Sequence, residues 1–245
     1  MAVFDVETNG GAGASVLSAS SIVFDESGVM LDVFNRFYFP AERFDPFTAR
    51  IHGLTAERLA VLRRHAPVYS LYFLEDWPDL MDFWGGWEVD GIAVHNLSFD
   101  LSFLPEMAQG AFMWWCSMKG LKQYCALQGR GGDYKYPKLG EAAAIVRDRL
   151  APPPAVMRAE EAIIEGLPHV SLFDCFELYC VMSRLAAHKE KFPTTRFAPA
   201  TVPFRPRAKE PLSHLPMTLL ESAAPCAFTD GVLRCDAVIR GMLAL

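Results

Sequence analysis

The first forty residues alternate between apolar and polar positions, a pattern typical of strands, whose side chains point to opposite faces with a period of two. Strands are predicted at residues 2–7, 16–25 and 29–39. A glycine-rich link at 10–14 and a polar turn at 26–28 join them. Links this short allow neighbouring strands to pair only in opposite directions, so the pattern predicts an antiparallel meander.

From residue 55 onward the apolar positions recur every three to four residues, which indicates helices, with two short apolar runs typical of buried strands. Helices are expected at 55–64, 71–84 (limited by Pro78), 99–109 (kinked or restarted at Pro105), 118–127, 139–150 and 170–189, and strands at 91–95 and 111–116. Strands first, then alternating helices and strands, indicate an α/β fold with a mixed central sheet flanked by helices.

The composition and periodicity of the sequence change again near residue 191. Residues 192–216 contain many prolines without periodicity, as in an extended arm or linker. Farther on, Asp230-Gly231 lies between apolar flanks, which is a hairpin signal. The chain is therefore divided into a folded domain, 1–190, and a proline-rich C-terminal extension with a candidate hairpin, 191–245.

Composition narrows the class of protein. The chain has 245 residues, 51% of them hydrophobic and 21% charged, as expected for a folded protein. No segment has the pattern of a membrane span or a signal peptide. Its six cysteines form no C-x-x-C pair, so we expect reduced thiols in a cytoplasmic protein and no zinc motif. The net charge of −6 argues against a surface that coats nucleic acid broadly, but it suits an enzyme with an acidic, cation-binding site.

The first predicted strand carries two acids, Asp5 and Glu7, whose spacing directs both side chains to one face. Buried carboxylates are costly unless a positive group meets them. A structural explanation exists, because edge strands and strand ends often carry such pairs.

Two further acids have structural explanations of their own. Asp100 follows the strand that ends at His95-Asn96, and an acid in the first turn of a helix interacts well with the helix dipole. Asp174 stands three residues after Ser171, which suggests a capping box with Ser171 as the N-cap. His169 precedes that cap and is expected on a loop over the same cleft.

Taken together, the four acids favour a site, because α/β folds build sites where strands end and helices begin. Carboxylates converging there need cations, and oxygen ligands without cysteine point to Mg²⁺ or Mn²⁺. Two such ions could promote attack on a phosphodiester, and a neutral histidine could accept the proton of the attacking water.

These motifs, Asp-x-Glu, H-N-x-x-F-D and H-x-x-x-x-D, resemble those of the DEDDh-type 3′–5′ exonucleases, which include proofreading subunits of DNA polymerases and have a ribonuclease H-like fold. The resemblance covers residues 2–185, and the stretch Ile51-His52-Gly53-Leu54-Thr55 looks like the family's I-H-G-I-T. It implies metal ligands at Asp5, Glu7, Asp100 and Asp174, with His169 as the general base. It also implies substrate contacts at Thr8, Asn9, Asn96 and Phe99.

The resemblance implies an enzyme that releases nucleoside monophosphates from the 3′ end of single-stranded DNA or RNA with two Mg²⁺ or Mn²⁺ ions. One feature departs from the family: Gly11 stands where a bulky residue usually wedges beside the terminal base. Alternatives are a catalytically idle binding or assembly module and a phosphohydrolase of small nucleotides. The extension is a candidate for binding a polymerase or a second copy.

Basic residues outside the motifs are candidates for contacts with the nucleic-acid strand. They lie in the extension (Arg196, Arg205, Arg207, Lys209), at Arg63-Arg64, and in a long loop that carries Arg130, Lys135 and Lys138. Tyr134 and Tyr136 in that loop are candidates for stacking on bases or for ordinary packing.

Overall fold

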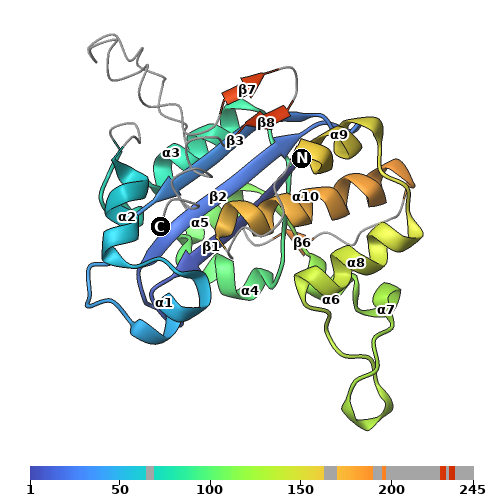
Figure 1. The fold of residues 1–245 in the computed structure, drawn as a ribbon, viewed down its shortest axis with the longest axis horizontal. Helices are drawn as coiled ribbons and strands as arrows, with labels where there is room; N and C mark the ends of the chain where they lie inside the picture. The colour runs from blue at the N-terminus through green and yellow to red at the C-terminus, as the bar shows by residue number, and fades with distance from the viewer. Residues whose placement is uncertain (65–68, 163–169, 190–194, 197–226, 230–231, 235–245) are drawn as a thin grey trace.

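A mixed sheet with helices on both faces forms the centre of the computed structural model, which describes residues 1–64, 69–162, 170–189, 195–196, 227–229 and 232–234 (Figure 1). The six strands lie in the order β3-β2-β1-β4-β5-β6. Their bounds are β1 Ala2–Thr8, β2 Val16–Phe24, β3 Met30–Phe37, β4 Gly91–Val94, β5 Met113–Cys116 and β6 Thr195–Arg196.

Strand directions confirm the predicted meander and mixed sheet. β1 pairs with β2, and β2 with β3, in antiparallel register, with Asp5 opposite Ser20 and Glu7 opposite Ser18. β1 pairs in parallel with β4, and β4 with β5, whereas β6 is antiparallel to β5. The carboxyl ends of β1, β4 and β5 therefore meet at one edge of the sheet.

The helices are more numerous and shorter than the sequence pattern predicts. Their bounds are α1 Pro46–His52, α2 Ala56–Arg63, α3 Phe73–Gly86, α4 Leu97–Asp100, α5 Glu106–Ala111, α6 Ser117–Gly120, α7 Lys122–Cys125, α8 Leu139–Arg149, α9 Pro154–Ala162 and α10 Ser171–Ala187, with 3₁₀ turns η1 Leu101–Phe103 and η2 Arg130–Gly132. The pattern missed α1 and α9. It also joined α4, η1 and α5 into one helix, although the expected restart at Pro105 is confirmed because Pro105 is the N-cap of α5.

Pro78 does not limit its helix, contrary to expectation. It lies inside α3, which continues to Gly86. A proline inside a helix costs roughly 3 kcal/mol. Residues beyond it, Leu80, Met81 and Trp84, are fully buried, and each large apolar side chain buried contributes about 1.5–3 kcal/mol. Burial of that face therefore outweighs the lost hydrogen bond.

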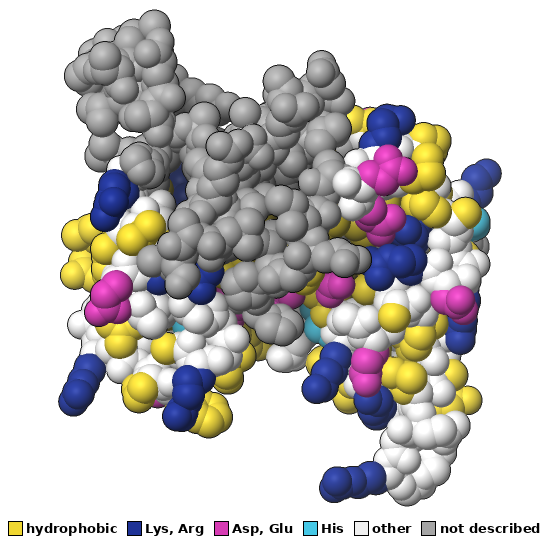
Figure 2. All heavy atoms as spheres, in the orientation of Figure 1, with side chains coloured by type: hydrophobic (Ala, Val, Ile, Leu, Met, Phe, Trp, Pro, Cys, Tyr) yellow, Lys and Arg dark blue, Asp and Glu magenta, His cyan; other side chains and the backbone are white. Residues whose placement is uncertain are grey.

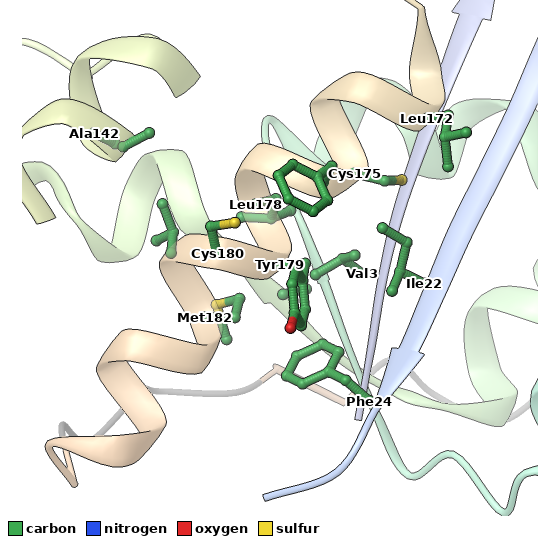
Figure 3. Packing of buried hydrophobic residues seen from close by; sticks show 14 of the residues in the cluster. Val3, Ile22, Phe24, Ala142, Leu172, Cys175, Leu178, Tyr179, Cys180 and Met182 are labelled. Carbon is green, nitrogen blue, oxygen red and sulfur yellow. The ribbon is translucent and has the colours of Figure 1, made fainter. Parts of the chain in front are cut away.

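Each face of the sheet has its own core, which the alternation along β1 creates. Val3 joins the cluster that contains α8 and α10, whereas Phe4 and Val6 join the cluster on the α3 side. Figure 3 shows α10 directing Cys175 and Tyr179 toward Val3, Ile22 and Phe24. Because Asp5 and Glu7 share the parity of Val3, both lie on one face, as predicted, and that face is the one covered by α10.

Three buried serines connect the first turn of α10 to β2. The Ser171 hydroxyl lies 2.8 Å from that of Ser18 and 2.7 Å from that of Ser20. Ser171 is therefore not the N-cap that the sequence suggests; Val170 takes that place, without a side-chain cap bond. The capping interpretation fails because partners from β2, about 150 residues away in sequence, occupy the hydroxyl.

The extension is described only in part. Ala227–Thr229 (β7) and Val232–Arg234 (β8) pair antiparallel, on either side of the predicted Asp230-Gly231 turn. That turn and the proline-rich stretch 197–226 lie outside the described residues. Among the described helices, none is long and apolar enough to cross a membrane.

The serine chain predicts a measurable loss of stability. Ser171→Ala leaves the buried Ser18 hydroxyl without its partner, so the free energy of unfolding is expected to fall by about 1–3 kcal/mol. Urea denaturation would measure this, with Ser98→Ala as a control, because Ser98 is exposed and its hydroxyl makes only a long contact of 3.4 Å with Asn96; the control should change stability by less than about 0.5 kcal/mol. Equal, small effects from both variants would contradict the role of the chain.

Candidate active site

Three carboxylates meet at the edge where the parallel strands end. Asp5 and Glu7 come from β1, and Asp174 comes from the first turn of α10. One oxygen from each lies within 4.8 Å of the others, and all three side chains are half-buried. Within the described part of the chain this is the one group of three or more side chains with the geometry to hold a metal ion.

Asp100 stands beside this group but is held differently. It is 2% exposed, and its Oδ1 accepts a hydrogen bond of 3.1 Å from the backbone N–H of Val6, between the two acids of β1. Its charge is the strongest of the neighbouring charges that act on Asp5. The four predicted acids are thus neighbours, with Asp100 joined to β1 through the backbone.

Electrostatics at the site favour protonated acids. The pKa of Asp5 is raised well above its usual value, first by burial and then by the charges of Asp100, Asp174 and Glu7. Burial, and then Asp174, raise the pKa of Glu7 to about 8. The pKa of Asp100 is also raised by burial, against the lowering effect of the Val6 N–H. Among the described residues, none with a positive charge contributes to the pKa of Asp5 or Glu7.

This donor set fits a hard divalent cation. The three close side chains offer oxygen only, and burial and the charges of the described neighbours all oppose the ionisation of Asp5 and Glu7. A cation would reverse that balance, because it favours ionised carboxylates. Mg²⁺ and Mn²⁺ prefer such ligands, whereas zinc sites usually contain cysteine or histidine.

The predicted general base, His169, lies outside the described residues. Its role therefore stays a prediction from the motif.

Asn9 serves the turn that follows β1. Its Nδ2 donates to Glu42 Oε1 and to the Arg43 carbonyl, both at 2.9 Å, and its Oδ1 accepts from the Asp45 N–H. Glu42 also accepts from the hydroxyl and N–H of Ser15, and these hydrogen bonds lower its pKa to about 2 against a raising effect of burial. We call these contacts the Asn9 clasp. It closes the glycine-rich turn and fixes the start of α1.

Thr8 is fixed from the other end of α1. Its Oγ1 donates to the Gly10 carbonyl at 2.7 Å, and its own carbonyl lies 3.2 Å from Nε2 of the buried His52. Because His52 Nδ1 accepts from the Leu54 N–H, the ring proton is on Nε2 and donates to Thr8. Burial lowers the pKa of His52, so the imidazole is neutral and the bond is kept near neutral pH.

Asn96 and Phe99 lie between β4 and Asp100. Asn96 has a left-handed backbone, with φ of 67°, and its carbonyl accepts from the Phe99 N–H at 2.8 Å. The Phe99 ring packs edge-on against Phe103, with ring centroids 5.1 Å apart. Both side chains are half-buried, so they retain surface that a substrate can contact.

Several residues that shape the site were missed in the sequence. Glu42 carries no motif, and only its contact with Asn9, 33 residues away, reveals its role. The I-H-G-I-T resemblance draws attention to His52 but assigns it no role, and its hydrogen bonds in the structure provide one. Helix α1 also carries two exposed apolar side chains, Phe47 and Ile51, one helical turn apart.

Sequence comparison finds no matching family model and no matching curated protein. Structural comparison finds the nuclease domain of 3′hExo, a DEDDh family member bound to rAMP, with a TM-score of 0.54 and 12% identity over 80% of this chain and 95% of that one. A full-length 3′-exonuclease has a TM-score of 0.51 and 12% identity over 79% and 84%. Exonuclease I from Methylocaldum szegediense has a TM-score of 0.51 and 16% identity over 78% of this chain and 41% of its own.

These similarities cover nearly the whole of the 3′hExo domain and include its mixed sheet with flanking helices. At identities this low, the similarities establish the fold and do not establish the role of any single residue. The chain has the ribonuclease H-like fold of the DEDDh-type 3′–5′ exonucleases.

Proposed function

We propose that the protein is a divalent-metal-dependent 3′–5′ exonuclease that releases nucleoside monophosphates from single-stranded DNA or RNA. The observation that carries the proposal is the close group of Asp5, Glu7 and Asp174, joined by Asp100, at one edge of an exonuclease fold. A fold alone permits many functions. Half-buried carboxylates that raise one another's pKa values are costly to keep ionised, which favours a site that binds cations.

In this proposal Asp5, Glu7, Asp100 and Asp174 hold two Mg²⁺ or Mn²⁺ ions, which would stabilise negative charge on the phosphate and on the leaving oxygen. His169 accepts a proton from the attacking water. The water oxygen bonds to phosphorus, and the 3′ oxygen of the preceding nucleotide leaves. Thr8, Asn96 and Phe99 contact the terminal nucleotide, and Asn9 contributes by fixing α1 beside it.

Removing single acids tests the assignment. Asp5→Asn and Asp174→Asn keep the shape of each side chain while removing a charge, so cleavage is expected to fall by at least about 100-fold with the fold intact. A gel of 5′-labelled single-stranded DNA and RNA with Mg²⁺ would show a one-nucleotide ladder for the wild type. Circular dichroism would check the fold.

Asp148→Asn, which changes an exposed acid on α8, is the matched control and should cleave like the wild type. A variant of Asp5 or Asp174 with wild-type rates would remove that residue from the ligand set. No ladder from the wild type on either substrate would favour the idle module.

Replacing His169 tests whether this histidine is the general base or a metal ligand. His169→Ala is expected to lower kcat by about 10²–10⁴-fold while the dissociation constant for Mn²⁺ stays within a few-fold of wild type. Calorimetry and single-turnover kinetics would measure the two effects. His188→Ala, at the far end of α10, is the control. A matching loss of Mn²⁺ affinity in His169→Ala would make the histidine a ligand.

The raised pKa of Glu7 predicts a pH dependence. In the metal-free protein Glu7 keeps its proton up to about pH 8, whereas in the unfolded chain it ionises above about pH 4.3. Stability of the metal-free protein should therefore fall as pH rises through this window, because the folded state binds more protons.

Metal ions select the ionised form, so Mg²⁺ binding at pH 7 should release about one proton or more per protein. Calorimetry in two buffers of different ionisation enthalpy would count the protons. Binding without proton release at pH 7 would contradict the raised pKa.

A further inference from the structure

Residues 127–138, here called the basic hairpin, project from the domain below α7 (Figure 1). The two sides are joined by a bridge between Gln128 and Tyr134 and by a hydrogen bond of 2.9 Å from the Lys135 N–H to the Leu127 carbonyl. At the tip, Gly131 and Gly132 have φ of 82° and 88°, which favours glycine. Backbone hydrogen bonds and two glycines at the tip therefore give these residues the conformation of a hairpin.

The basic hairpin and the residues around its base concentrate positive charge in an acidic protein. Residues 119–141 contain five Lys or Arg and two acids, while the whole chain has a net charge of −6. The two acids are paired, Asp133 with Lys122 at 2.7 Å and Glu141 with Lys135 at 2.5 Å. Arg130 and Lys138 are exposed and form no ion pair among the described residues. Figure 2 shows Lys or Arg at the tip of the projection.

An aromatic ring accompanies these charges. Tyr136 is 50% exposed, and Lys122 Nζ lies 5.1 Å from the centre of its ring. A tyrosine that is half open to solvent and held against a cation can stack on a base.

His95 joins the foot of the hairpin to the active-site edge. Its Nδ1 lies 2.8 Å from the Ser117 hydroxyl, and its ring also hydrogen-bonds the backbone carbonyl of Pro137. His95 directly follows β4 and precedes Asn96 and the Asp100 helix. The hairpin thus leaves the domain from the end of the sheet at which the acids gather.

We propose that the basic hairpin binds the substrate strand upstream of its 3′ end, with Arg130 and Lys138 on phosphates and Tyr136 on a base. This proposal rests on the proposed exonuclease function. The combination of exposed cations with an exposed ring favours a nucleic-acid strand over an acidic peptide, which offers carboxylates but no bases.

Two substrates separate upstream binding from chemistry. A 20-nucleotide single strand reaches the hairpin, whereas the p-nitrophenyl ester of thymidine 5′-monophosphate has no upstream phosphate. The double variant Arg130→Gln/Lys138→Gln should lower kcat/KM on the 20-mer by roughly tenfold, as should Tyr136→Ala. Both should hydrolyse the ester at wild-type rates.

Salt adds a second readout. Each lost phosphate contact should reduce the slope of log(kcat/KM) against log[salt] on the 20-mer by about 0.7, so the double variant should lose about 1.4. Arg158→Gln is the matched control, since Arg158 is exposed on α9, away from the hairpin in Figure 1. It should leave both the rate and the slope unchanged.

Wild-type kcat/KM and salt slope in the hairpin variants would overturn the proposal, as would an equal loss on the 20-mer and the ester. Fluorescence anisotropy of a labelled 20-mer without metal tests the hairpin even if the wild type cleaves neither substrate, which would count against the proposed function alone. The hairpin variants should then bind about tenfold more weakly than wild type. If poly-glutamate competed as well as unlabelled 20-mer, the hairpin would bind polyanions in general, and the proposal that it recognises a nucleic-acid strand would be wrong.

Discussion

Repulsion among carboxylates is the constraint around which this domain is organised. Asp5, Glu7 and Asp174 lie together, with Asp100 beside them, and their charges make one another harder to ionise. Left to themselves such groups would separate or keep their protons. The scaffold must therefore hold them, and the contacts around them do so on three sides.

The first support is β1 itself, whose apolar residues anchor it in both cores while its acids emerge on the α10 face. The second is the serine chain, which ties the turn before Asp174 to β2, opposite Asp5 and Glu7. The third is the Val6 N–H, which fixes Asp100. Apolar packing, hydroxyl contacts and a backbone N–H make up these supports, and none of the three brings a positive charge to the carboxylates.

The sequence predicted what depends on local rules. The period of two along β1 placed Asp5 and Glu7 on one face, and the order of strands and helices indicated the mixed sheet. It failed where distant partners decide the outcome. Ser171 looked like a cap because its partners on β2 cannot be recognised locally, and Pro78 looked like a helix limit because the burial of Trp84 is a tertiary effect. The Asn9 clasp depends on Glu42, for which no spacing rule exists.

The Asn9 clasp has a consequence for the small residues that follow Gly10. Asn9 and Ser15 hold the turn from its two ends, and the contacts of the stretch between them are made by backbone groups of Gly10, Gly11 and Ala14. At Gly11 the backbone is ordinary, and a β-carbon would meet no atom within 4 Å. The backbone at position 11 therefore does not require glycine, and a bulky side chain would be tolerated there. A larger side chain at position 11 would therefore fit without straining the turn or displacing the acids of β1, and in the proposed exonuclease it would stand beside the terminal base.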